Sequence, residues 1–228
     1  MITLKRGSSL RQLQSINHQI YGLKDDRDYS MWDLLSNQER FMMRAIKGIR
    51  KGDHKKLRMN LAVATSWFLA VMNRLHIDLE EAVWERFPYL CSYCGHTTCQ
   101  CKIIKPKKRA KLTIDNKKRP ETLSGYQEMF ENIYPHKTRN LEHAGIHLAE
   151  EQGEVSEALQ VYYGQHTKEG FQNIIEELAD YFSCVMGVFN SSGIDFEKEM
   201  MRLYANNCHV CHDAPCTCDF VTVAKFKF

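Results

Sequence analysis

Two cysteine clusters with the same spacing constrain this 228-residue chain more than any other feature. The segments CSYCGHTTCQC (91–101) and CHVCHDAPCTC (208–218) both follow the pattern C-x2-C-x4-C-x-C, at an offset of 117 residues. The offset extends upstream, where Asn73 falls on Asn190. The chain therefore contains an internal repeat, which is a strong constraint on architecture.

Further upstream the offset between the two copies becomes 113, as in the match of Tyr21 with Tyr134. The first copy is thus four residues shorter between its middle helices. We place the copies at 8–101 and 121–218, joined by a basic linker at 102–120.

Apolar residues recur at helical spacing through most of the chain, which predicts an all-α protein of two tandem four-helix units. In the second copy we expect helices at about 122–133, 139–163, 168–190 and 195–206.

The cysteines are typical of structural zinc sites, because four thiolates can complete a tetrahedral Zn2+ site. The N-terminus has no apolar run typical of a secretory signal, so metal binding is a better interpretation than disulfides. We expect a cytoplasmic protein with two structural Zn2+ ions and no membrane segment. The predicted zinc ligands are Cys91, Cys94, Cys99, Cys101, Cys208, Cys211, Cys216 and Cys218.

Two acidic pairs lie on consecutive predicted helices of the second copy. Glu151 and Glu154 are three residues apart, as are Glu177 and Asp180, and each pair lies beside an apolar stripe. Partly buried carboxylates need a compensating positive charge. Oxygen ligands from two helices suit Mg2+ or Mn2+, so we predict a divalent-cation site formed by these four residues.

The segments EEQGE (150–154) and EELAD (176–180) resemble the E-E-x-x-E and E-x-x-D signature of the MazG-like, all-α nucleoside triphosphate pyrophosphohydrolases. The resemblance covers roughly residues 123–205, and the cysteine clusters lie outside the usual family pattern. It implies Mg2+-dependent cleavage of a nucleoside triphosphate to the monophosphate and pyrophosphate. It also implies assembly into homo-oligomers. Because a tandem chain could reproduce such a dimer internally, we expect the two units to form a pseudo-dimer.

Within this chemistry, one carboxylate not fully committed to the metal could accept a proton from water, and Glu150 and Glu151 are the candidates. Lys198 and Arg202, four residues apart, are candidates for holding phosphate oxygens, or are solvated surface residues. Asn190 could line the base pocket.

In the first copy none of the four acids is retained. By the same offsets they become Gln38, Phe41, Asn60 and Val63. We therefore expect this copy to be catalytically silent.

Two other functions remain open from the sequence. Residues 102–119 carry nine lysines or arginines and one acid, which suits an exposed linker or a nucleic-acid contact. With zinc knuckles beside it, the chain could be a nucleic-acid-binding protein on a helical scaffold. It could also be a nucleotide sensor without catalytic turnover.

Overall fold

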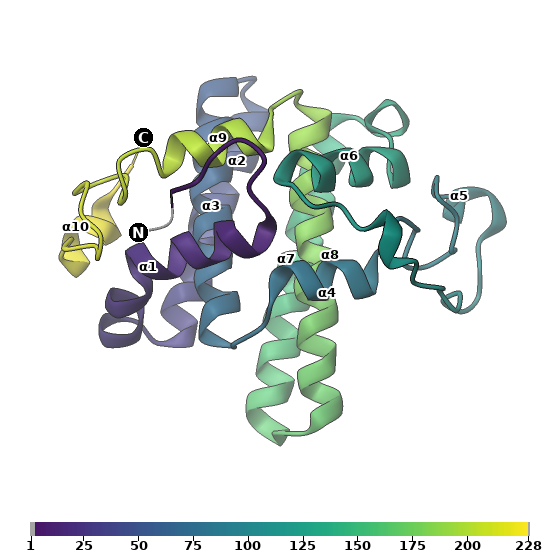
Figure 1. Ribbon diagram of the computed structural model, residues 1–228, viewed down its shortest axis with the longest axis horizontal. Helices are drawn as coiled ribbons and strands as arrows, with labels where there is room; N and C mark the ends of the chain where they lie inside the picture. Colours follow the sequence, from purple (N-terminus) through teal and green to yellow (C-terminus); the bar gives the residue numbers. More distant parts are fainter. Residues whose placement is uncertain (1–2, 228) are drawn as a thin grey trace. The chain divides into compact units, whose positions relative to one another are not determined.

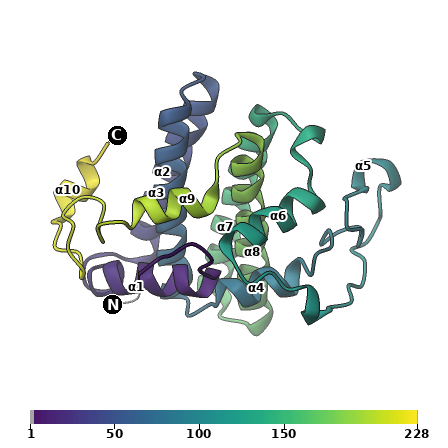
Figure 2. The same cartoon turned by 45° about the horizontal axis from the view of Figure 1, so that its top comes forward.

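The computed structural model describes residues 3–227, and in this part of the chain all regular structure is helical, as predicted. It contains ten α-helices and two short 3-10 helices, and no strand is found among the described residues. The helices belong to two compact units (Figures 1 and 2). Unit 1 combines the chain up to Leu79 with the chain from Phe196 onward, and unit 2 comprises Glu80–Asp195.

Unit 1 is built around the antiparallel pair α2 and α3, across which α1 and α9 pack (Figure 1). Its C-terminal segment carries the second cysteine cluster and ends in a short helix. The helices of unit 1 are α1 (Leu10–Asp28), α2 (Met31–Arg50), α3 (His54–Arg74), α9 (Phe196–Leu203) and α10 (Phe220–Lys225).

Unit 2 is built around a longer antiparallel pair, α7 and α8, with α6 packed on α8 (Figures 1 and 2). The first cysteine cluster and the basic linker belong to this unit. Its helices are α4 (Leu79–Arg86), whose first residue falls in unit 1, α5 (Cys101–Ile104), η1 (Asn116–Lys118), α6 (Leu123–Ile133), η2 (His136–Thr138), α7 (Leu141–Gln165) and α8 (Lys168–Ser191).

Local sequence explains where the long helices begin. Ser9 and Ser30 each form a reciprocal capping box with the residue three positions later. Asn140 caps α7 and Thr167 caps α8, each by accepting a backbone N–H of the first turn. Between these two helices His166 adopts a left-handed conformation, φ 52°, which ends α7 and allows a tight reversal.

The helix boundaries in the second copy agree with the predicted ones to within three residues. The four additional residues of this copy lengthen the arms of the α7–α8 hairpin beyond those of α2–α3. The hairpin is the long green pair that extends downward in Figure 1.

The two compact units do not follow the repeat boundaries 8–101 and 121–218. Unit 2 takes its α4 and its cysteine cluster from the first copy, whereas unit 1 takes α9 and its cysteine cluster from the second. The copies have thus exchanged their last helix and their cysteine cluster. We call the cluster at 91–101 the first knuckle and the cluster at 208–218 the second knuckle.

Side-chain chemistry explains why this exchange is specific. In unit 1, Tyr204 follows α9 and its hydroxyl lies 3.0 Å from Asn17 Nδ2 and 2.9 Å from Ser66 Oγ, in a buried polar triad. The equivalent residues in unit 2 are Phe87 and Phe130, whose rings pack with centroids 5.2 Å apart. The alternative pairing would bury Asn17 against phenylalanine without its hydroxyl partner, which is costly.

Within residues 3–227, no helix combines the length and the hydropathy required to cross a bilayer.

Candidate active site

Three of the four predicted acids converge in unit 2. Carboxylate oxygens of Glu151 on α7 and of Glu177 and Asp180 on α8 all lie within 4.8 Å of one another. We call these three residues the acid cluster. Because helix residues three apart share a face, the spacing of Glu177 and Asp180 directs both toward α7.

An arginine of the first copy compensates part of this charge. Arg86, the last residue of α4, donates Nε to Asp180 Oδ1 at 3.0 Å and Nη2 to Asp180 Oδ2 at 2.5 Å. Its Nη1 donates to Glu176 at 2.5 Å. The guanidinium is therefore divided between Asp180 and Glu176, and such bidentate pairs are strong.

The other two carboxylates of the cluster have no direct ion pair with an arginine, although Arg86 lowers the pKa of both from a distance. Oε2 of Glu151 and Oε2 of Glu177 are buried and, among the described residues, have no hydrogen-bond partner. Burial, followed by repulsion from the neighbouring acids, raises the pKa of Glu151 to about 8 and that of Glu177 to about 7. Buried carboxylates of this kind must hold a proton or a cation.

The fourth predicted ligand, Glu154, and the other predicted proton acceptor, Glu150, lie outside the acid cluster. Glu154 is exposed and is not among the three converging carboxylates, although its charge contributes to the raised pKa of Glu151 and Glu177. Glu150 is also exposed and does not line the adjoining cavity. Of the two predicted proton acceptors, only Glu151 faces the space that a substrate could occupy.

A cavity of about 560 Å³ opens beside the acid cluster, within the size range of small-molecule sites. Glu151, Asp180 and Cys184 form part of its wall. Cys184 is buried and also faces this space. The first knuckle and the linker also line the cavity. Their lining residues include Tyr93, Arg109 and the segment Thr98–Ile103.

Both cysteine clusters have the geometry of a tetrahedral metal site. Sγ–Sγ separations are 3.6 Å for Cys91–Cys99, and 3.5 Å and 3.9 Å from Cys208 to Cys216 and Cys218. Zn–S bonds of about 2.3 Å in a tetrahedron place sulfurs about 3.8 Å apart. The two four-cysteine clusters are therefore consistent with zinc sites.

The two knuckles also attach to their units in the same way. Cys99 N donates to Ile133 O at 2.8 Å in unit 2, and Cys216 N donates to Ile20 O at 2.7 Å in unit 1. Each knuckle thus bonds to the first helix of the other copy. The first knuckle bonds to the last residue of α6, and the second bonds to a residue inside α1.

The pocket of unit 1 that corresponds to this cavity is nearly filled. Its volume is about 30 Å³. Phe41 replaces Glu154, Trp67 replaces Cys184, and Phe226, eight residues after its knuckle, replaces Arg109. Apolar side chains thus nearly fill the pocket in unit 1, whose α2–α3 hairpin lacks the acids.

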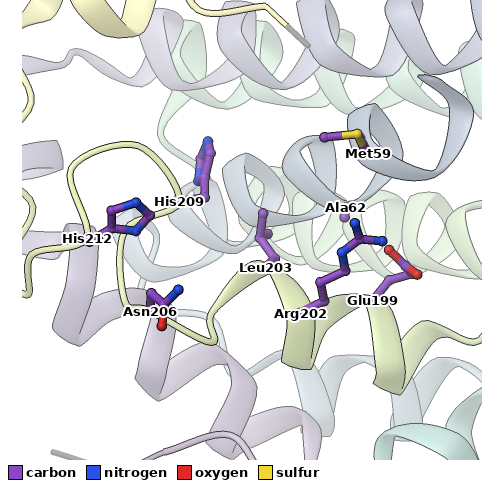
Figure 3. A pocket seen from close by; sticks show the side chains of 8 residues that line it. All are labelled: Met59, Ala62, Glu199, Arg202, Leu203, Asn206, His209 and His212. Carbon is purple, nitrogen blue, oxygen red and sulfur yellow. The ribbon is translucent and has the colours of Figure 1, made fainter. Parts of the chain in front are cut away.

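The predicted phosphate-binding residues Lys198 and Arg202 lie on α9 of unit 1, whereas the acid cluster belongs to unit 2. Arg202 lines a separate cavity of about 180 Å³, where it lies beside Glu199 (Figure 3). Asn190 belongs to unit 2, but its side chain is bonded to Gln127, with Gln127 Nε2 donating at 3.0 Å.

Three arginines of the site were not predicted from the sequence. Arg86 and Arg109 belong to the first copy and the linker, so no local motif connects them with the acids. Arg139 lines the cavity from the segment before α7. A long-range signal linking these positions to the acids would have been needed to find them.

No family model, no curated protein and no solved structure matches this chain.

Proposed function

We propose that this protein is a Mg2+-dependent nucleoside triphosphate pyrophosphohydrolase with one active site, at the acid cluster of unit 2. The observation that carries the proposal is the pair of buried, unpartnered oxygens on Glu151 and Glu177. Carboxylate oxygens of these two residues and of Asp180 lie within 4.8 Å of one another, beside a cavity large enough for a small molecule.

The donor set fits a hard divalent cation. Carboxylate oxygens are the ligands that Mg2+ and Mn2+ prefer, and Mg2+ is commonly held by one or two carboxylates together with water and substrate phosphates. Glu151, Glu177 and Asp180 would hold the ion, with Glu154 available at the rim. When bound, Mg2+ would neutralise phosphate charge and polarise the group under attack.

The chain itself would position and activate the water. Glu151 lines the cavity and has an oxygen without a hydrogen-bond partner among the described residues, so a carboxylate oxygen that the cation does not engage could accept a proton from water. Arg86 holds Asp180 in a fixed orientation through two hydrogen bonds. A proton taken by Glu151 would come from water attacking the α-phosphorus, with pyrophosphate as the leaving group.

The internal repeat supports a functional role for the acids. The silent copy retains the helices and replaces the acids with Gln38, Phe41, Asn60 and Val63. The corresponding pocket, in unit 1, is nearly filled by aromatic side chains. The fold therefore does not need the carboxylates, and they occur where a cavity is retained.

The test is pyrophosphate release with Mg2+ across ordinary, deoxy and modified nucleoside triphosphates. Glu177→Gln is expected to reduce the rate by a factor of about 100 or more, because it removes a cation ligand. Glu157→Gln is the control and should retain the rate, because Glu157 is an exposed residue of α7 that lies outside the acid cluster. Absence of turnover on every nucleotide by the wild-type protein would contradict the proposal.

The nucleic-acid alternative depends on the basic linker, part of whose charge is used within unit 2. Arg119 pairs with Glu81 at 2.9 Å, and Arg109 lies 3.6 Å from Asp180. Salt-sensitive RNA or DNA binding that survives Glu177→Gln and is lost when the linker lysines are neutralised would favour this alternative.

A further inference from the structure

The cavity in unit 2 is lined by both carboxylates and guanidinium groups. Glu151 and Asp180 line it together with Arg109 and Arg139. A ligand that binds a cation at the acids and also satisfies two arginines must itself be an extended anion. This arrangement identifies a class of ligand, independently of any sequence motif.

Arg109 is held over the acid cluster by the first knuckle. The backbone N–H of Ala110 donates to Tyr93 O at 2.9 Å, and Arg109 Nη1 lies 3.4 Å from Ser92 Oγ. The guanidinium stacks over the Tyr93 ring, 5.4 Å from its centroid. Its Nη2 lies 3.6 Å from Asp180 Oδ2, so it reaches the acid cluster and keeps donors for a ligand.

Arg139 extends into the same cavity from the segment before α7. Its guanidinium lies 5.4 Å from the centroid of the Tyr134 ring. A Cβ added at Gly187 on α8 would lie 3.2 Å from Arg139 Nη1, so the glycine leaves room for it. Among the described residues, no carboxylate pairs with Arg139.

Neither arginine has a basic counterpart in unit 1. At the same offsets, Arg109 corresponds to Phe226 and Arg139 to Asp26. Phe226 fills the closed pocket, and Asp26 pairs with Arg74 at 3.2 Å. The two cations occur only where the acids and the open cavity occur.

We propose that Arg109 and Arg139 bind the phosphate chain of a polyphosphate ligand and hold it against the acid cluster. This assignment rests on the proposed function for the identity of the substrate, a nucleoside triphosphate. Guanidinium groups suit the task because their planar N–H donors pair bidentately with phosphate oxygens. It places substrate binding on the first knuckle and linker, in contrast to Lys198 and Arg202 of unit 1.

The test is calorimetric binding of inorganic tripolyphosphate to the zinc-loaded protein at a fixed MgCl2 concentration. Arg109→Ala and Arg139→Ala should each weaken binding by roughly 10-fold to 100-fold, the usual effect of removing a hydrogen bond between charged groups. Lys111→Ala and Lys137→Ala are matched controls, since each removes an exposed cation two residues away that does not line the cavity. They should change binding less than about 2-fold, within the range of surface charges.

The outcomes separate this assignment from the proposed hydrolysis. Tripolyphosphate binding that depends on both arginines supports the assignment, even if no nucleotide releases pyrophosphate. Absence of tripolyphosphate binding, or equal losses in the two lysine controls, overturns it. Turnover with an unchanged KM in Arg109→Ala and Arg139→Ala also overturns it, while leaving the hydrolase proposal intact. Zinc content and thermal melting of each variant confirm that the fold is retained.

Discussion

Replacing Glu151 by glutamine should stabilise the protein in the absence of Mg2+ and abolish its response to Mg2+. Burial and neighbouring acids raise the pKa of this carboxyl from 4.5 to about 8 in the folded chain. A raised pKa means that the folded state binds the proton more tightly than the unfolded state. Stability from this group is therefore complete below pH 4.5 and is lost as pH rises through about 8.

The size of the effect follows from the pKa difference. A rise from 4.5 to about 8 corresponds to about 4 to 5 kcal/mol at pH values above both. Because Glu151 is only partly buried, water screens much of this, and we expect about 1.5 kcal/mol. For a chain of this length that is an increase of about 3 to 6 °C in Tm.

The assay is thermal denaturation at pH 8 of zinc-loaded protein freed of other metals, with and without MgCl2. Wild type should gain stability with Mg2+ according to mass action, whereas Glu151→Gln should start higher and gain little. Glu157→Gln should behave like wild type. If Glu151→Gln lowers the Tm without Mg2+, or gains as much from Mg2+ as wild type does, the carboxylate is a structural element and the cation site is wrong.

Three further results are expected. The affinity for Mg2+ should rise as pH increases from 6 to 8, because Glu151 and Glu177 must lose protons to bind the ion. Their pKa values in the metal-free protein are about 8 and about 7. A Mg2+ titration at several pH values measures this. Tyr204→Phe should destabilise the protein by about 1 to 3 kcal/mol in urea denaturation, because it leaves a buried polar triad incomplete. Cys99→Ser and Cys216→Ser should each lower the zinc content, measured by metal analysis, from two ions to one. Only Cys99→Ser should weaken tripolyphosphate binding, because the first knuckle lines the cavity and the second does not.

Much of the local structure could be predicted from the sequence. Helical periodicity and capping residues such as Thr167 determine the helices, and the cysteine spacing predicts both four-cysteine clusters. The three-residue spacing of Glu177 and Asp180 places them on one face of α8, where the structure finds them together. Glu154 lies outside the converging group, and its side chain is exposed although its neighbour Val155 is buried.

The exchange of helices and knuckles could not be predicted in this way. It depends on which copy supplies the partner of Asn17 and of Phe130, and both candidates, Tyr204 and Phe87, occupy the same place in their repeats. No local pattern distinguishes the two connections. For the same reason Arg86, which belongs to the first copy, was not expected beside acids of the second.

Direct binding of Mn2+ to the zinc-loaded protein, measured by electron paramagnetic resonance, is the sharpest test of the acid cluster as a cation site. Wild type and Glu157→Gln should bind Mn2+, and Glu177→Gln, which removes one of the converging carboxylates, should lose this binding. Equal Mn2+ binding by wild type and Glu177→Gln, or no binding by either, would contradict the cation site and with it the proposed catalysis.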